Sequence, residues 1–243
     1  MTTQQRSPHF LILGAARAGT TWLCRMLAQH PEVAISDPKE PDFLVSTEGG
    51  PSYLGPGDEI IRKRVVSDED AWRRLFTGHP ESVRSGESSV STLYFPHIAV
   101  ERIEQFAPNA KLIVSLRAPW DRARSAHQLM RGKGLETLEF SDALAAEEDR
   151  RKAGWHPIWS YRSQSLFADQ LEPFVQHFGD RLLVVEYERL VKDPSELQRI
   201  QEHIGVTVQP LIDPGAVNES VEPRSVLIRR VVRRLHSIPF VRR

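Results

Sequence analysis

The sequence predicts an α/β protein in which helices flank a central parallel sheet. Apolar runs short enough to be buried strands occur at residues 10–13 and 111–116, and each is followed by a turn and a helical pattern. Strands that alternate with helices are typical of a doubly wound sheet, which binds ligands at the carboxyl ends of its strands. We therefore expect the functional residues at that edge.

The first unit runs from strand to loop to helix. Phe10 to Leu13 is closed by Gly14, and the helix that follows the glycine loop ends at His30-Pro31. The single cysteine, Cys24, lies in this helix, so it forms no intrachain disulfide and is expected to pack in the core. One face of the helix carries Trp22, Leu23, Met26 and Leu27.

Later segments repeat this order. A strand at Lys111 to Leu116 leads through a turn to a helix from about Asp121 toward Met130. A third strand is expected within residues 181–190, after a helix over 165–178. Between these units, residues 36–57 indicate an irregular loop at the active edge, and residues 86–96 a short strand or turn.

Length and charge divide the chain into two parts. With 243 residues and 40% hydrophobic content, we expect one domain over residues 1–223 and a basic amphipathic segment over 224–243. That segment holds seven arginines and no acid in a chain of zero net charge, so residues 1–223 carry −7. Two interpretations stay open for it: contact with an anionic membrane, or packing on the domain with Arg224 or Arg229 directed at phosphates.

The N-terminal sequence, the length of the apolar runs and the spacing of the histidines bear on where the protein is located and on whether it binds a metal. The polar N-terminus and the lack of about 18 consecutive apolar residues predict a soluble cytoplasmic protein, with peripheral contact at the inner face of the membrane as an option for the basic segment. The nine histidines form no metal-binding spacing, so we expect no metal. We expect no nucleic-acid partner.

The stretch FLILGAARAGTTWL has the glycine spacing of the Walker phosphate loop, but Thr20 stands where that loop has lysine. Backbone N–H groups of a glycine turn entering a helix bind an anion whatever the side chains are. The nearest cation is Arg17, and the second strand ends in Arg117 rather than in a magnesium-binding aspartate. The loop therefore indicates a P-loop-like three-layer fold and a metal-free 5′ anion, unless its spacing arose by chance.

A second loop, LRAPWDRARS, presents Arg117 at a strand end and Ser125 eight residues later. A guanidinium fork and a hydroxyl suit a second phosphate. Two anion sites at one sheet edge predict a doubly phosphorylated nucleotide, although an arginine in this position is often only a surface ion-pair partner.

These segments resemble the sulfotransferases that use 3′-phosphoadenosine-5′-phosphosulfate (PAPS). GAARAGTTWL is similar to their 5′-phosphosulfate loop, and LIVSLRAPWDRARSAHQ to their 3′-phosphate motif. PKEPDF, GESSVSTLY and the segment 165–194 resemble the branch of heparan-sulfate-type and bacterial carbohydrate sulfotransferases. The matches run in order from about residue 9 to 195.

The resemblance implies a PAPS site. Residues 18–21 would cradle the 5′-phosphosulfate through the backbone of Ala18 and Gly19 and the hydroxyls of Thr20 and Thr21. Arg117 and Ser125 would bind the 3′-phosphate, so adenosine 3′,5′-bisphosphate (PAP) is the expected product. Trp22 would stack on adenine, or it packs on the helix face instead.

The resemblance also implies catalytic roles. Glu40 would be the base that accepts the acceptor's proton, unless it is a solvated loop carboxylate. Arg17, where the family often has lysine, would stabilise the leaving phosphate electrostatically, because arginine cannot donate a proton. Lys39 would orient the acceptor or lower the pKa of its neighbour, or it is solvated.

The acceptor side is less defined. Asp42 replaces the family's usual histidine, and Ser88 and Val90 replace lysine and proline. Asp42 and Glu87 are expected there, together with Trp155 and Tyr161 from the aromatic segment 155–162, although core packing is the default for such aromatics. A saccharide, a glycolipid or another small molecule would fit.

Three functions compete at this stage. A PAPS-dependent sulfotransferase is preferred. A degenerate P-loop kinase or NTPase would require ATP with magnesium, and a non-catalytic anion-binding module would leave Glu40 directed away from the cleft.

Overall fold

Five parallel strands form the central sheet of the protein, which we describe from a computed structural model. The structure describes residues 7–46 and 53–212. The strand order is β2-β3-β1-β4-β5, with every neighbouring pair parallel. The chain leaves β1 toward β2 and leaves β4 toward β5, so the direction of winding reverses between β1 and β4. The predicted α/β fold with a parallel sheet is confirmed.

The elements of this part of the chain follow in order. The strands are β1 (Phe10–Gly14), β2 (Val33–Ile35), β3 (Arg84–Glu87), β4 (Lys111–Leu116) and β5 (Leu182–Glu186). The α-helices are α1 (Thr20–Leu27), α2 (Asp58–Arg62), α3 (Glu69–Arg74), α4 (Pro96–Phe106), α5 (Pro119–Gly132), α6 (Phe140–Ala145), α7 (Glu147–Lys152), α8 (Phe167–Phe178), α9 (Tyr187–Leu190) and α10 (Pro194–Ile204). Short 3₁₀ helices are η1 (Phe43–Val45), η2 (Pro157–Trp159), η3 (Ser163–Ser165) and η4 (Gly179–Arg181).

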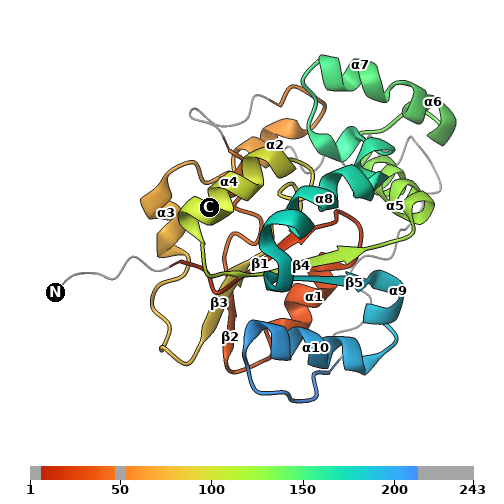
Figure 1. Cartoon of the computed structure of the whole chain (residues 1–243). Helices are drawn as coiled ribbons and strands as arrows, with labels where there is room; N and C mark the ends of the chain where they lie inside the picture. The colour runs from red at the N-terminus through yellow and green to blue at the C-terminus, as the bar shows by residue number, and fades with distance from the viewer. Residues whose placement is uncertain (1–6, 47–52, 213–243) are drawn as a thin grey trace, which may run out of the picture.

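Alternating side chains of the strands fill two cores, one on each face of the sheet. Leu11 and Leu13 of β1 point to the side covered by α3, α4 and α8, whereas Phe10 and Ile12 point to the side covered by α1, α9 and α10. Figure 1 shows α4 and α8 above the sheet and α1 and α10 below it. The apolar run of β1 is continuous because both of its faces are buried.

A smaller cluster lies beside the sheet, where α5, α6 and α7 meet η2 at the upper right of Figure 1. Arg122 of α5 is fully buried there, and its guanidinium donates to Ser165 Oγ at 2.5 Å, Gln164 Oε1 at 3.1 Å and the Tyr161 carbonyl at 2.6 Å. Burial lowers the pKa of Arg122 to about 10, so it stays charged. These bonds fix α5, which carries Ser125, against η3.

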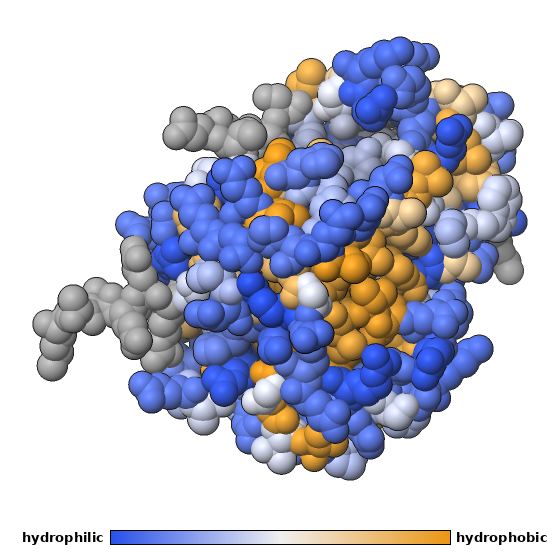
Figure 2. All heavy atoms as spheres, viewed as in Figure 1, coloured by the Kyte–Doolittle hydropathy of each residue, from blue (hydrophilic) through white to orange (hydrophobic). Residues whose placement is uncertain are grey.

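The sheet is open along β5, which pairs only with β4 among the described strands. Beside it lies a groove of about 440 Å³ with an apolar floor at Leu116, Val184 and Val185 and a charged rim from α9 and α10. Figure 2 shows apolar side chains gathered over this part of the molecule, surrounded by polar ones.

The predicted elements are found with shifted bounds. The strand at 111–116 is β4, and the helix expected from Asp121 begins two residues earlier at Pro119. The third strand ends at Glu186, because residues 187–190 turn into α9. The basic segment 224–243 lies outside the described residues.

Candidate active site

The loop between β1 and α1 is fastened to the next strand. Ala15 N donates to the Ser115 carbonyl at 2.8 Å, and the buried Ser115 hydroxyl donates to the Ala18 carbonyl at 2.7 Å. Gly19 precedes α1, and no side chain caps the helix. The N–H groups of its first turn therefore remain for an anion.

Gly19 is required at its position for two reasons. Its φ of 82° is in the left-handed region, and an added Cβ would lie 2.6 Å from Tyr187 Cδ2. Tyr187 is the first residue of α9, at the carboxyl end of β5. The loop and the end of β5 are thus in close contact.

Gly19→Ala should lower the free energy of unfolding by about 1–3 kcal/mol, because it combines backbone strain with overpacking. Gly78→Ala is the matched control, since Gly78 has the same φ of 82° but nothing within 4 Å of its added Cβ. Urea denaturation of both variants separates strain from contact. Equal losses in the two variants would contradict the close approach of Tyr187.

The residues predicted to bind the two phosphates form one cluster. Arg17 Nε donates to Ser125 Oγ at 3.1 Å across 108 positions of sequence, and Arg117 Nη1 donates to the Arg17 carbonyl at 3.4 Å. The Arg117 guanidinium lies 4.9 Å from the centre of the Tyr187 ring. The first and second anion loops therefore meet at the β1–β4 switch point.

Among the described residues, no carboxylate compensates the charge of this cluster. Burial lowers the pKa of Arg17, and the charge of Arg117 lowers it further. Within the described part of the chain, neither guanidinium forms an ion pair with a carboxylate, and the buried Arg117 Nε has no hydrogen-bond partner. Arg17 also has a φ of 70°, which a non-glycine residue rarely adopts. Two adjacent cations that have no carboxylate partner in residues 7–46 and 53–212 are suited to a phosphate-bearing ligand.

Glu40 lies in the loop that follows β2. Its carboxylate accepts from Lys39 Nζ at 3.1 Å and from Arg64 at 2.5 Å, and Arg64 also lies 3.9 Å from Asp42. Its side chain is 19% exposed, so one part of it faces solvent. Arg64 follows α2, and no motif in the sequence singled it out.

Lys133 connects the Glu40 region with the arginine cluster. Burial lowers the pKa of Lys133, the charges of Arg64 and Arg17 lower it further, and Glu40 raises it. Lys133, at the end of α5, therefore lies within electrostatic range of both Glu40 and Arg17. It too was missed by sequence reasoning, since a lone lysine after a helix carries no distinctive signal.

Asp42 and Glu87 are buried beneath this region, with exposed fractions of 6% and 1%. Burial is the main cause that raises the pKa of Asp42 to about 6 and of Glu87 to about 7. Ser91 Oγ donates to Asp42, and Trp72 Nε1 donates to Glu87 at 3.1 Å. Their burial does not fit the acceptor contact expected for them.

The three aromatic residues predicted to contact ligands differ in how deeply they are buried. Tyr161 is fully buried and its hydroxyl donates to Glu136 Oε2 at 2.9 Å, so its ring has no face for a sugar and this expectation does not fit the structure. Trp155 is half-buried, edge to face with Trp159 at 5.0 Å. Trp22 packs against the core around α1, so one of its two interpretations, packing, is observed.

The described residues offer no group of histidine, cysteine or carboxylate side chains arranged to hold a metal ion. In the same part of the chain, no helix combines the length and hydrophobicity that a membrane span needs.

Comparison with known proteins identifies relatives. A family model described as "Sulfotransferase family" matches residues 8–210. Heparan sulfate glucosamine 3-O-sulfotransferase 3B1 of Mus musculus is 28% identical over 206 residues, 82% of this chain and 46% of that protein. Heparan sulfate glucosamine 3-O-sulfotransferase 6 of Homo sapiens is 28% identical over 210 residues, 84% of this chain and 54% of that protein. The chain spans about half the length of these relatives.

Solved structures agree with this match. The crystal structure of a sulfotransferase from Alicyclobacillus acidocaldarius superposes with a TM-score of 0.81 at 35% identity, covering 88% of this chain and 87% of that one. The sulfotransferase domain from the curacin biosynthetic pathway has a TM-score of 0.55 at 20% identity and supports the fold alone.

Proposed function

Because the chain belongs to the sulfotransferase family, we propose that it transfers a sulfuryl group from PAPS to a hydroxyl or amine of an acceptor. The observation that carries this proposal is the uncompensated cluster of Arg17, Arg117 and Ser125 beside the loop that enters α1. It supplies two phosphate-binding positions at one sheet edge, as a nucleotide with both 5′ and 3′ anions needs.

The donor-side residues have separate tasks in this proposal. The N–H groups of the first turn of α1 and the hydroxyls of Thr20 and Thr21 bind the 5′ group. Arg117 and Ser125 bind the 3′-phosphate, and the unpaired Arg117 Nε supplies a donor for it. Arg17 lies between the two and neutralises charge that develops on the leaving phosphate, without transferring a proton.

Glu40 is the base in this proposal. Lys39 and Arg64 bind its carboxylate, and a carboxylate is the form that accepts a proton from an acceptor hydroxyl. Both cations also limit the orientations of the carboxylate. PAPS supplies an activated sulfuryl group, so the reaction requires positioning, a base and stabilisation of the leaving phosphate.

The relatives support one acceptor class. Two of them are named for transfer to the glucosamine of heparan sulfate, which supports a carbohydrate acceptor here, with a glycolipid or small molecule as the other candidates. Arg64 lies beside Glu40, and Lys133 is within the range of the Glu40 charge, so both cations are candidates for orienting the acceptor.

Incubation with ³⁵S-labelled PAPS and a panel of saccharides, glycolipids and hydroxylated small molecules tests the proposal. We expect labelled product and equimolar PAP, with the same rate in EDTA. Sulfate release that needs magnesium, or an absence of transfer to every acceptor class together with no PAP binding, would contradict it.

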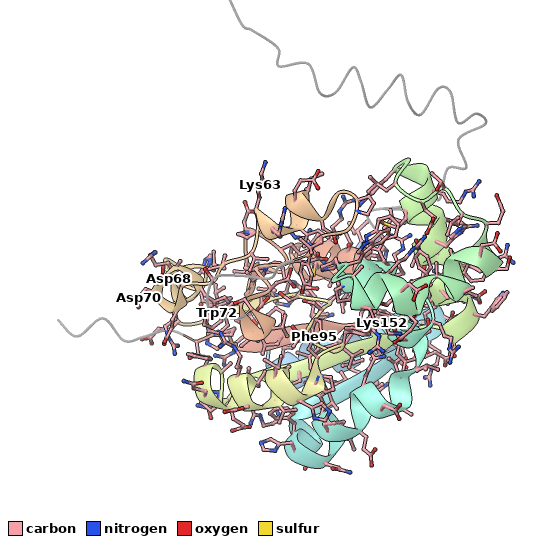
Figure 3. The ribbon with its side chains drawn as sticks, turned by 90° about the horizontal axis from the view of Figure 1, so that it is seen from above. Lys63, Asp68, Asp70, Trp72, Phe95 and Lys152 are labelled. Carbon is pink, nitrogen blue, oxygen red and sulfur yellow. The ribbon has the colours of Figure 1, made fainter. Side chains whose placement is uncertain are left out.

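Arg64→Ala should lower kcat about tenfold, because Glu40 loses one of the two cations that fix its orientation. PAP affinity should stay unchanged, since the ion pairs of Arg64 with described residues are to Glu40 and Asp42, outside the phosphate loops. Lys63→Ala is the control: Lys63 precedes Arg64 but points away from the molecule in Figure 3. Steady-state kinetics of both variants check this, and equal effects would contradict a specific role for Arg64.

A further inference from the structure

The loop that carries Glu40 is fastened to the segment that leaves β3. Ser88 N donates to the Lys39 carbonyl at 3.2 Å, and Asp42 N donates to Ser89 Oγ at 3.0 Å. These bonds bracket Glu40 on both sides. Asp42 has a φ of 53°, so its backbone conformation depends on such contacts.

The Ser89 hydroxyl connects this loop to Glu87. Ser89 Oγ accepts from Asp42 N and donates to Glu87 Oε2 at 2.5 Å. The other oxygen of Glu87 accepts from Trp72 Nε1 at 3.1 Å, and Figure 3 shows Trp72 on the inner side of α3. An indole N–H only donates, and a serine hydroxyl has one proton. With Ser89 and Trp72 both donating, each oxygen of Glu87 is an acceptor, as in an ionised carboxylate.

Protonation of Glu87 would disturb this chain of hydrogen bonds. The new carboxyl proton would have to be donated to Ser89 Oγ, and the Ser89 proton would then lose its acceptor. Burial raises the pKa of Glu87 to about 7, the Ser89 and Trp72 hydrogen bonds lower it, and the charges of Asp42 and Glu40 raise it. The cations next to these carboxylates are Lys39 and Arg64, which form ion pairs with Glu40. A change in this chain of bonds is therefore expected near neutral pH.

We propose that Glu87 is a positioning residue: its ionised carboxylate orients Ser89, which holds the backbone of Asp42 and thereby the carboxylate of Glu40. This inference rests on the proposed function, in which Glu40 is the base that has to be positioned. It replaces the acceptor contact expected for Glu87 with an action through the protein. Sulfuryl transfer is then fastest above the pKa of Glu87 and declines as the pH falls through it.

Glu87→Gln tests this by removing the titrating group at nearly constant volume. We expect kcat at pH 8 to fall about tenfold and the acid limb near pH 7 to disappear, while PAP affinity stays within twofold of wild type. Ser89→Ala should give the same two changes with Glu87 intact. Trp72→Phe should shift the limb to higher pH, because it removes a bond that lowers the pKa of Glu87. An unchanged acid limb in Glu87→Gln and Ser89→Ala would overturn the proposal.

A readout without turnover separates this proposal from the proposed function. In wild type, the ¹H–¹⁵N resonances of the Trp72 indole and the Asp42 amide should titrate together near pH 7, and in Glu87→Gln neither should. Independent or absent titration of the two in wild type would overturn the connection through Ser89. Joint titration in a protein that transfers no sulfate would support the connection and contradict the proposed function alone.

Discussion

Glu40→Gln is expected to lower kcat by about 10²- to 10⁴-fold, the usual contribution of a positioned general base. Glutamine keeps the shape of the side chain but cannot accept the acceptor's proton. It also loses the negative charge that Lys39 and Arg64 bind. PAP affinity should change little, because the interactions of Glu40 lie outside the two phosphate loops. Single-turnover transfer from labelled PAPS measures the chemical step directly.

Glu59→Gln is the matched control for this variant. Glu59 is an exposed carboxylate on α2, five residues before Arg64 in the chain. Its replacement should leave kcat unchanged. If Glu40→Gln retained more than about a tenth of wild-type kcat, Glu40 would not be the base.

Arg117→Ala is expected to weaken PAP binding by about 2 kcal/mol or more, roughly 30-fold in Kd, the scale of a lost hydrogen bond to a charged group. Arg117 lies against Arg17 and over the Tyr187 ring, and its buried Nε has no partner among the described residues. The variant should bind AMP as wild type does, because AMP has no 3′-phosphate. Calorimetric titration with both nucleotides measures this difference.

Arg124→Ala separates a local effect from a general loss of positive charge. Arg124 is on the same helix, α5, and is exposed, so its removal should leave PAP affinity within about twofold. Equal weakening of PAP and AMP in Arg117→Ala would contradict a 3′-phosphate role.

The sequence predicted the parallel sheet and the positions of the two loops at its edge because their signals are local. A buried strand such as 111–116 is a continuous apolar run, and a glycine loop before a helix has fixed spacing. The short helix α9 was missed, because Tyr187–Leu190 directly follow the apolar residues of β5 with no glycine or proline to mark the end of the strand. The basic segment 224–243 stays a prediction.

The environment of Glu40 was not predictable in the same way. Arg64 and Lys133 belong to no motif. Arg64, after α2, pairs with Glu40, and Lys133, at the end of α5, lies within the range of its charge only because the chain folds. The burial of Asp42, Glu87 and Tyr161 likewise depends on packing between distant segments. Residue type suggested acceptor contacts for these three, whereas the fold uses them inside the protein.

The measurement that tests the central claim most directly is calorimetric binding of PAP to the wild-type protein, compared with ATP in the presence of magnesium. It needs no knowledge of the acceptor. The account predicts tight PAP binding that is independent of magnesium and exceeds binding of ATP with magnesium. A preference for ATP with magnesium, or no binding of PAP, would contradict the assignment of Arg17, Arg117 and Ser125 to a PAPS site.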